Sequence, residues 1–394
     1  MPGQSVPGHR TDSPDPSSDP SRIRPSAKHP IIVIGASAGG VEALVDLVAK
    51  LPSDLTAAMF IAVHFPASST SLLPQILSRL HTLPAHHAVD GEPIQTSQIY
   101  IAPPNHHLLI SLGRIRLSRG PRENGHRPAI DTMFRSAAYA YRDRVIGVIL
   151  TGTLDDGTAG LLTIKALGGM TIVQDPEEAL FDGMPRSAIE TVNVDWVLRI
   201  ADITRHLVET VAQEQSSLDA NAAQPLNEFP PEGHRNETAM PDPENVILDE
   251  DNQVARSKAS SERGEQPGNA SPLTCPDCGG VLWELRDQSM VRFRCHVGHA
   301  YSIDSLVEEQ SQDVEKSLWT AVRALEEKAA LARRMAVHAK EQHRTKSAQQ
   351  FEERASETEQ HAAVIRQLII NQISRQASVG NGERGQPQDD REAH

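Results

Sequence analysis

The stretch Ile31-Ile32-Val33-Ile34-Gly35-Ala36-Ser37-Ala38-Gly39-Gly40 decides the fold of this chain. Its first four residues are apolar and β-branched, which is typical of a strand that is buried on both faces. The glycines that follow allow a sharp turn, and the apolar residues after them recur with helical spacing. Ser37 is therefore expected at the carboxyl end of a buried strand, at the point where a helix begins.

The turn around Ser37 has three interpretations. Gly-x-Ser-x-Gly fits a nucleophile turn, in which a tight corner exposes the Ser hydroxyl. It also partly fits a dinucleotide fingerprint with Ser37 in place of the middle Gly, and it could be a plain turn between strand and helix. A dinucleotide site expects an acidic residue at the end of the next strand, but the apolar run 59–63 is followed by His64. An imidazole is what a Ser nucleophile needs as its base.

Strand and helix patterns alternate over residues 30–214. This alternation predicts an α/β domain with a doubly wound, mostly parallel sheet. The exception is residues 108–117, where a turn centred on Gly113 predicts an antiparallel hairpin. The predicted strands cover 31–34, 58–63, 98–102, 145–150, 170–174 and 194–198, and the predicted helices cover 41–50, 70–80, 130–142, 157–168, 185–191 and 202–213.

A third buried strand, 145–150, also leads into a glycine-rich turn, and this turn carries Asp155 and Asp156. Functional groups of open α/β sheets collect at the carboxyl ends of the strands. Ser37, His64 and one of the two acids are therefore expected at one edge, as the parts of a hydrolytic triad. The alternatives are a structural role for His64 and helix capping by the two acids.

Several motifs extend this pattern over residues 30–200. They are Ile34-Gly35-Ala36-Ser37-Ala38-Gly39-Gly40, Val63-His64-Phe65, Tyr100-Ile101-Ala102-Pro103, Arg127-Pro128-Ala129-Ile130-Asp131, Ile149-Leu150-Thr151-Gly152 with Asp156-Gly157, and Gly183-Met184-Pro185-Arg186. In this order they resemble the catalytic domain of the bacterial chemotaxis protein-glutamate methylesterase (CheB-type) family. The resemblance implies the α/β fold of that family, a Ser-His-Asp triad and no cofactor for catalysis.

By this resemblance, Ser37 is the nucleophile, His64 the general base and Asp156 the acid that orients it. The family places its acid directly before the Gly, which selects Asp156 over Asp155. The oxyanion hole is expected from the backbone N–H groups near Ala38 and Thr153. Family members often carry Thr or Ser at the first of these positions and Met at the second, which matters little because backbone groups donate.

The reaction implied by the resemblance is hydrolysis of a glutamate γ-methyl ester on a chemoreceptor-like protein, giving glutamate and methanol. Some family members also deamidate glutamine. The well-known family architecture has a receiver domain ahead of the esterase domain. Here only residues 1–29 precede it, and their Pro- and Ser-rich composition predicts a disordered tail and no N-terminal receiver.

Residues 215–271 form an acidic stretch that predicts a disordered linker, and all three cysteines of the chain follow it. Cys275, Cys278 and Cys295 together with a histidine have the spacing of a structural zinc site, within a zinc-ribbon-like module at 272–301. His299 gives the usual spacing and is favoured over His296. Buried or redox-active thiols are the alternative.

Two amphipathic patterns over residues 302–375 predict a helical hairpin or coiled coil, and residues 376–394 predict a disordered tail. Acidic and basic residues are mixed on both helices and the formal net charge is −14, so a nucleic-acid partner is not expected. The C-terminal module is instead expected to bind a methyltransferase or another signalling partner. The first helix has its apolar stripe at Leu318, Val322, Leu325, Ala329, Ala332 and Val337, and the second at Phe351, Ala355, Ala362, Ile365 and Ile369.

The sequence contains no signal peptide and no apolar segment long enough for a membrane span, so no membrane insertion is expected. With three cysteines, a cytoplasmic location is expected. Two function classes compete with the esterase: a non-catalytic signalling scaffold built on the zinc ribbon and helices, and a dinucleotide-binding domain.

Overall fold

A computed structural model of the chain describes residues 29–65, 71–222, 268–287 and 290–382. Three stretches lie outside the described residues: 1–28 of the predicted tail at 1–29, 223–267 of the predicted linker at 215–271, and 383–394 of the predicted tail at 376–394. The described residues fall into two compact units. None of their helices is long and apolar enough to cross a lipid bilayer.

The first unit is built on a seven-stranded sheet with the order β3-β4-β2-β1-β7-β8-β9. All neighbouring strands in it are parallel, and a separate antiparallel hairpin pairs β5 with β6. The predicted α/β fold class is therefore confirmed. The strands are β1 (Ile31–Ala36), β2 (Ala58–Val63), β3 (Ala85–His87), β4 (Gln98–Ile101), β5 (His107–Ser111), β6 (Arg114–Ser118), β7 (Val145–Ile149), β8 (Met170–Gln174) and β9 (Trp196–Leu198).

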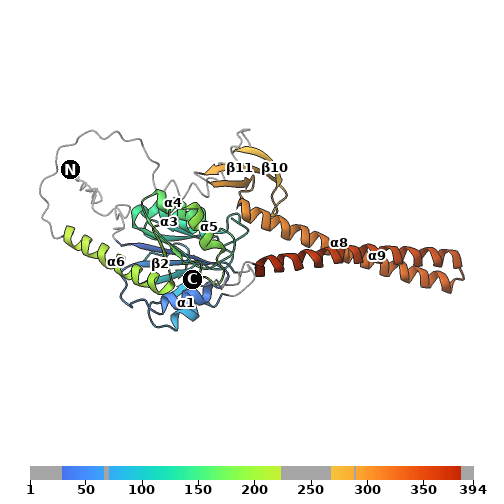
Figure 1. The fold of residues 1–394 in the computed structure, drawn as a ribbon, viewed down its shortest axis with the longest axis horizontal. Coiled ribbons are helices and arrows are strands. Elements are labelled where there is room, and N and C mark those ends of the chain that lie inside the picture. Colours follow the sequence, from blue (N-terminus) through green and yellow to red (C-terminus); the bar gives the residue numbers. More distant parts are fainter. Residues whose placement is uncertain (1–28, 66–70, 223–267, 288–289, 383–394) are drawn as a thin grey trace, which may run out of the picture. The chain divides into compact units, whose positions relative to one another are not determined.

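Helices cover both faces of the sheet, as Figure 1 shows. One apolar core packs α1, α2 and α6 on one face, and a second packs α3, α4, α5 and the β5–β6 hairpin on the other. Every residue of the central strands β1, β2 and β7 is buried, which explains their continuous apolar runs. The helices are α1 (Gly40–Val48), α2 (Leu73–Ser78), α3 (Ile130–Tyr141), α4 (Thr158–Ala166), α5 (Gly183–Thr191) and α6 (Ile200–Ala222).

Strand β1 lies between β2 and β7. The earlier strands of the chain therefore extend the sheet on one side of β1, and the later strands extend it on the other side. In this register Ala36 is paired with Val63 of β2, and Gly35 with Ile149 of β7. The segments that follow the three strands therefore emerge side by side. This is the switch point at which open α/β sheets place their functional groups.

Two features of the first unit differ from the sequence predictions. The short edge strand β3 was not predicted, because its residues Ala-His-His are only partly buried and have little strand propensity. Helix α6 continues to Ala222, past residue 214, where the sequence predicts the domain to end.

A second, four-stranded sheet with the order β10-β11-β12-β13 forms a ribbon. Its strands are β10 (Asn269–Thr274), β11 (Val281–Asp287), β12 (Met290–Cys295) and β13 (Ala300–Ser302). The β11–β12 pair is antiparallel and lies within the predicted zinc-ribbon-like module, and β12 also pairs with β13. Strands β11, β12 and β13 belong to the same compact unit as the large sheet.

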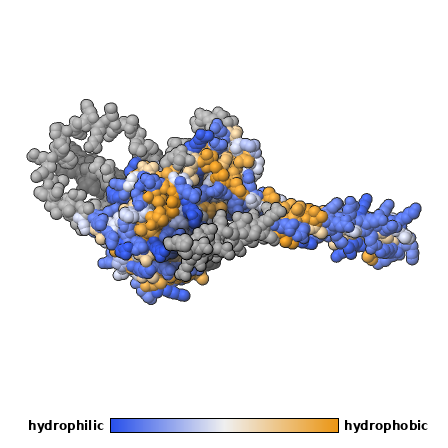
Figure 2. Space-filling model, viewed as in Figure 1, coloured by the Kyte–Doolittle hydropathy of each residue, from blue (hydrophilic) through white to orange (hydrophobic). Residues whose placement is uncertain are grey.

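The second unit is dominated by two long helices, α8 (Ile303–Glu341) and α9 (Thr345–Gly382), which form a hairpin. Small side chains such as Ala329, Ala355 and Ala362 are buried in its seam, whereas Val337 of the predicted stripe is 56% exposed and Ala336 is buried instead. On the face drawn in Figure 2, the closed end of the hairpin is mostly hydrophilic and apolar side chains gather nearer the open end.

Candidate active site

Three predicted residues meet at the carboxyl edge of the large sheet. The imidazole of His64, just after β2, has its Nδ1 3.0 Å from Ser37 Oγ, just after β1. Its other nitrogen, Nε2, lies 2.7 Å from Asp156 Oδ2, in the turn after β7. A carboxylate can only accept, so Nε2 carries the proton and Nδ1 is left as the acceptor that faces the Ser37 hydroxyl.

The turn that carries Ser37 is fixed to the turn after β7. The Ser37 N–H donates to the carbonyl oxygen of Thr151 at 3.0 Å, and the Thr151 hydroxyl donates to the carbonyl oxygen of Ala38 at 3.0 Å. Gly152 lies so close behind Ser37 that an added Cβ would stand 2.9 Å from Ser37 Cβ and 2.1 Å from Met184 Sδ. Only a residue without a side chain lets these two turns approach each other.

The Asp156 carboxylate accepts several hydrogen bonds besides that of His64. Its Oδ2 accepts from the Ile130 N–H at 2.7 Å, and its Oδ1 accepts from the Asp131 N–H at 3.2 Å and from Asn124 Nδ2 at 2.9 Å. Burial alone would raise the pKa of Asp156, but the hydrogen bond and charge of His64, together with the Ile130 N–H, hold that pKa well below its usual value. Asp156 is therefore a charged acceptor in a buried place.

Asp131 is the counterpart of Asp156. Its Oδ1 accepts from the N–H groups of Gly157 at 3.1 Å and Gly160 at 2.7 Å, at the start of α4, whereas Asp156 accepts at the start of α3. Asp156 thus accepts at the N-terminus of α3, which contains Asp131, and Asp131 accepts at the N-terminus of α4, which begins two residues after Asp156. Burial, and then the nearby Asp156 charge, raise the pKa of Asp131 to about 7.

His126 stacks on the imidazole of His64. The ring centroids of His126 and His64 are 3.6 Å apart and the rings are inclined by 12°. Burial lowers the pKa of His126 to about 3, and positive charge on His64 acts in the same direction. The stack therefore restrains the plane of His64 with a neutral ring.

The depressed pKa of His126 predicts an acid sensitivity of the fold. Unfolded His binds its proton near pH 6.5, so the stability due to neutral His126 is complete above that pH and is lost as the pH falls toward 3. His126→Phe keeps a stacked ring without a titrating group. We expect its urea unfolding free energy to fall less steeply than that of the wild type between pH 6.5 and 4. The control is His81→Gln, a substitution at an exposed histidine. If the unfolding free energies of the wild type and the Phe variant changed equally with pH, the prediction would be wrong.

The two predicted oxyanion donors lie in turns that follow neighbouring strands. Ala38 is in the turn between β1 and α1, and the exposed Thr153 is in the turn after β7. Among the described residues, no hydrogen bond uses the backbone N–H of either one. Asp155 is also buried, and its Oδ1 accepts from the Ser302 hydroxyl at 2.8 Å.

The sequence did not predict a role in this site for Asn124, His126 or Asp131. The first two belong to the segment Glu123-Asn124-Gly125-His126, whose two ends exchange backbone hydrogen bonds of 3.2 and 2.9 Å. Asn124 and Gly125 have φ angles of 51° and 75°, which is the type I′ turn that Asn-Gly favours. The Asn-Gly pair was therefore the available sequence signal for the turn, although not for its place beside the triad.

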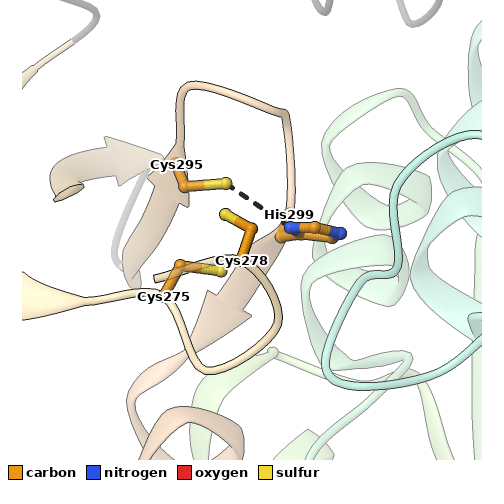
Figure 3. A group of neighbouring side chains, drawn as sticks. All are labelled: Cys275, Cys278, Cys295 and His299. Carbon is orange, nitrogen blue, oxygen red and sulfur yellow. Dashed lines mark hydrogen bonds between the residues drawn. The ribbon is translucent and has the colours of Figure 1, made fainter. Parts of the chain in front are cut away.

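The predicted metal ligands also come together, as Figure 3 shows. The ligand atoms of Cys275, Cys278, Cys295 and His299 all lie within 4.8 Å of one another, whereas His296 is exposed and outside the group. The Cys295 Sγ–His299 Nδ1 distance is 3.6 Å. Tetrahedral zinc with its usual bond lengths would separate a sulfur and a nitrogen ligand by roughly 3.6 Å, so this donor set fits zinc.

The triad arrangement is suited to nucleophilic catalysis. A hydroxyl, an imidazole and a charged carboxylate are hydrogen-bonded in series. In such a series the imidazole can take the hydroxyl proton while the carboxylate stabilises the imidazolium that forms.

Comparison with known proteins finds similar chains. Residues 32–207 match the family model of the CheB methylesterase domain. A putative protein-glutamate methylesterase/protein-glutamine glutaminase of Leptospira interrogans is 43% identical over 173 residues, which are 44% of this chain and 90% of that relative. A relative of Geobacter metallireducens with the name protein-glutamate methylesterase/protein-glutamine glutaminase 1 is 38% identical over 186 residues, and the chain spans about half (51%) of its length.

Among solved structures, the CheB methylesterase catalytic domain of Thermotoga maritima is 35% identical, with 46% of this chain and 99% of that chain covered and a TM-score of 0.45. The matched region of the family model contains Ser37, His64 and Asp156. The ribbon and the helical hairpin lie outside it. Because the chain is 43% identical to the Leptospira relative and covers 90% of it, and because residues 32–207 match the family model, this chain belongs to the CheB methylesterase family.

Proposed function

We propose that this chain is a serine esterase that hydrolyses glutamate γ-methyl esters on chemoreceptor-like proteins. Ser37 is the nucleophile, His64 the general base and Asp156 the acid that orients the imidazole. The observation that carries the proposal is the series of two hydrogen bonds, 3.0 and 2.7 Å long, through His64. No cofactor takes part in this chemistry.

The reaction has two halves. Ser37 Oγ attacks the ester carbonyl while His64 Nδ1 takes the hydroxyl proton, and the N–H groups of Ala38 and Thr153 stabilise the oxyanion. His64 then gives the proton to the methoxide oxygen, so methanol leaves and an acyl-enzyme remains. Water, deprotonated by His64, attacks the acyl-enzyme and releases glutamate and Ser37. With a glutamine side chain the same steps release ammonia, which gives the deamidation after which the relatives are also named.

A protein substrate requires an accessible site. Leu180 and Phe181 are 71% and 42% exposed, although both are large and apolar. They border the nucleophile turn, because the Phe181 carbonyl accepts from the Gly152 N–H at 2.9 Å and the Leu180 Cβ lies against Gly39. We include this apolar edge in the proposal as the surface that contacts a receptor helix.

The C-terminal ribbon would hold one structural zinc ion. The donors would be Cys275, Cys278, Cys295 and His299, and the ion would connect two turns. A backbone hydrogen bond closes each turn: the Gly279 N–H donates to the Cys275 carbonyl at 2.8 Å, and the Gly298 N–H donates to the Cys295 carbonyl at 3.0 Å. The proposed organisation is a catalytic domain over residues 30–214, a ribbon module at 272–301 and a helical hairpin at 302–375 that binds a signalling partner. The proposed location is the cytoplasm.

The experiment is methanol release from membranes that carry receptors with labelled methyl groups. The wild type should release labelled methanol, and Ser37→Ala should not. A parallel assay should detect ammonia from receptors with glutamine at the same positions. If the wild type releases neither product while the chain still binds receptor membranes, the non-catalytic scaffold is the correct function.

A further inference from the structure

A buried ion cluster joins the ribbon to the esterase domain within the first unit. Glu123 Oε2 lies 2.6 Å from Arg135 Nη2 of α3 and 2.9 Å from Arg292 Nη2 of β12, and Arg294 of β12 is 3.7 Å from Oε1. Glu123, Arg135 and Arg292 are each no more than 7% exposed. Such a cluster depends on all of its members, because removing one leaves a buried charge with fewer partners.

Strand β13 contacts the same segment through its backbone. The Asn124 N–H donates to the Ala300 carbonyl at 2.8 Å, and the Ala300 N–H donates to the Arg122 carbonyl at 3.2 Å. The Ser302 N–H donates to Asn124 Oδ1 at 3.0 Å. The ribbon therefore holds both the backbone and the side chain of Asn124.

The other end of the Asn124 side chain is bound to the triad. Its Nδ2 donates to Asp156 Oδ1 at 2.9 Å and to Asp131 Oδ2 at 3.0 Å. Two residues later, His126 stacks on His64. One amide group thus connects the ribbon, through its oxygen, to the catalytic carboxylate, through its nitrogen.

We propose that strands β12 and β13 are a positioning element of the active site, with Arg292 and Ser302 holding the Asn124–Gly125 turn that orients Asp156 and His64. This inference rests on the proposed esterase function. The ribbon lies outside residues 32–207, so this support is an addition to the part of the chain that matches the family model. Arg292 acts through Glu123 and Asn124 and touches no substrate.

The charges around the turn explain why it needs the ribbon. Glu123, Asp131 and Asp156 form a group of buried carboxylates on the esterase side, and Arg292 brings a positive charge close to two of them, with Asp131 Oδ2 4.0 Å away. Without this charge, Arg135 and Arg294 remain beside Glu123, but the repulsion among the carboxylates is less well balanced and favours a turn that moves outward to water. Asp156 would then lose the Asn124 donor, and His64 its stacked ring.

The test compares two arginines on the same ribbon hairpin. Arg292→Met removes the buried cation, and Arg286→Met removes an arginine of β11 whose side chain is 79% exposed and 3.6 Å from Glu284. With the full chain and a small methyl ester, Arg292→Met should lower kcat by roughly 10- to 100-fold with little change in KM, as small displacements of catalytic groups do. Arg286→Met should match the wild type, and Arg292→Lys should recover part of the lost kcat.

A double-mutant cycle tests the route through the turn. Asn124→Gly keeps the backbone conformation at φ 51° but removes the amide, so Arg292→Met should cost far less in that background than in the wild type. An equal cost in both backgrounds would overturn the proposal, as would an Arg292→Met enzyme with the kcat of Arg286→Met.

Hydrogen exchange gives a readout that does not depend on activity. Residues 120–131 should exchange faster in Arg292→Met than in Arg286→Met, while the exchange of β1 and β2 stays unchanged. If the wild type proves inactive on every ester, the proposed function fails, yet this exchange comparison still decides whether the ribbon holds the turn. Equal exchange of residues 120–131 in the two variants would show that it does not.

Discussion

Asp156→Asn is expected to lower kcat for ester hydrolysis by roughly 10⁴-fold, close to the loss expected for Ser37→Ala and His64→Ala. In the folded protein, Asp156 accepts the Nε2–H of His64 at 2.7 Å. An amide can present its NH₂ group there, which favours the tautomer with the proton on Nδ1. That nitrogen faces Ser37 Oγ, so the imidazole could no longer accept the hydroxyl proton. Steady-state kinetics on a small methyl ester measures the effect.

Asp155→Asn is the matched control, since it makes the same change at the neighbouring residue. Asp155 Oδ1 accepts from the Ser302 hydroxyl, and an amide oxygen can accept there as well. We therefore expect less than about a tenfold loss for this variant, because the hydrogen bond from Ser302 is kept. If Asp155→Asn were the more damaging substitution, the assignment of the acid would be wrong.

Removal of the metal is expected to have the second large effect. The purified chain should contain about one zinc ion, and structural zinc sites in small modules bind with about 10–16 kcal/mol of free energy, which is also folding free energy. A chelator should therefore unfold the ribbon at residues 269–302. Elemental analysis measures the metal, and hydrogen exchange of the ribbon strands measures their loss of structure.

Two histidine substitutions sharpen the metal prediction. His299→Ala should abolish stoichiometric zinc, because His299 Nδ1 lies among the three sulfur atoms. His296→Ala should retain the zinc, since His296 is exposed and outside the ligand group. It is the matched control, because it lies only three residues from His299. Zinc-free protein after purification under reducing conditions, or loss of zinc in the His296 variant alone, would refute the proposed site.

Much of the fold could be predicted because the central strands are buried on both faces. Continuous apolar runs such as 31–34 and 58–63 have no amphipathic alternative, and their order with the intervening helices indicates a parallel sheet. The edge strand β3 lacks this signal. The end of α6 was also missed, because its last turns carry polar residues and have no apolar face to mark them.

The inner part of the site was similarly accessible from sequence. Ser37 and His64 each follow a buried strand directly, so the parallel sheet brings them to one edge. Periodicity could not choose between Asp155 and Asp156, and the choice rested on the family motif. In the folded chain the two carboxylates diverge: Asp156 meets His64, and Asp155 meets Ser302.

The layer around the triad could not be predicted, because it depends on pairing between distant segments. Asn124 and Ser302 are 178 residues apart, and Glu123 and Arg292 are 169 apart. Nothing in the composition of residues 122–126 indicates which strand they contact. The linker and ribbon patterns predicted a separate module, and its shared compact unit with the sheet emerges only from the three-dimensional contacts.

The long separation between Asn124 and Ser302 has a consequence for the newly made protein. All three triad residues have been synthesised by residue 156, whereas the strand that holds the Asn124 turn comes much later. At about 5–20 residues per second, a ribosome needs roughly 7–29 s to add the 146 residues from Asp156 to Ser302. During that interval the nascent chain carries its complete triad without the support of β13, and only translation beyond the ribbon supplies it.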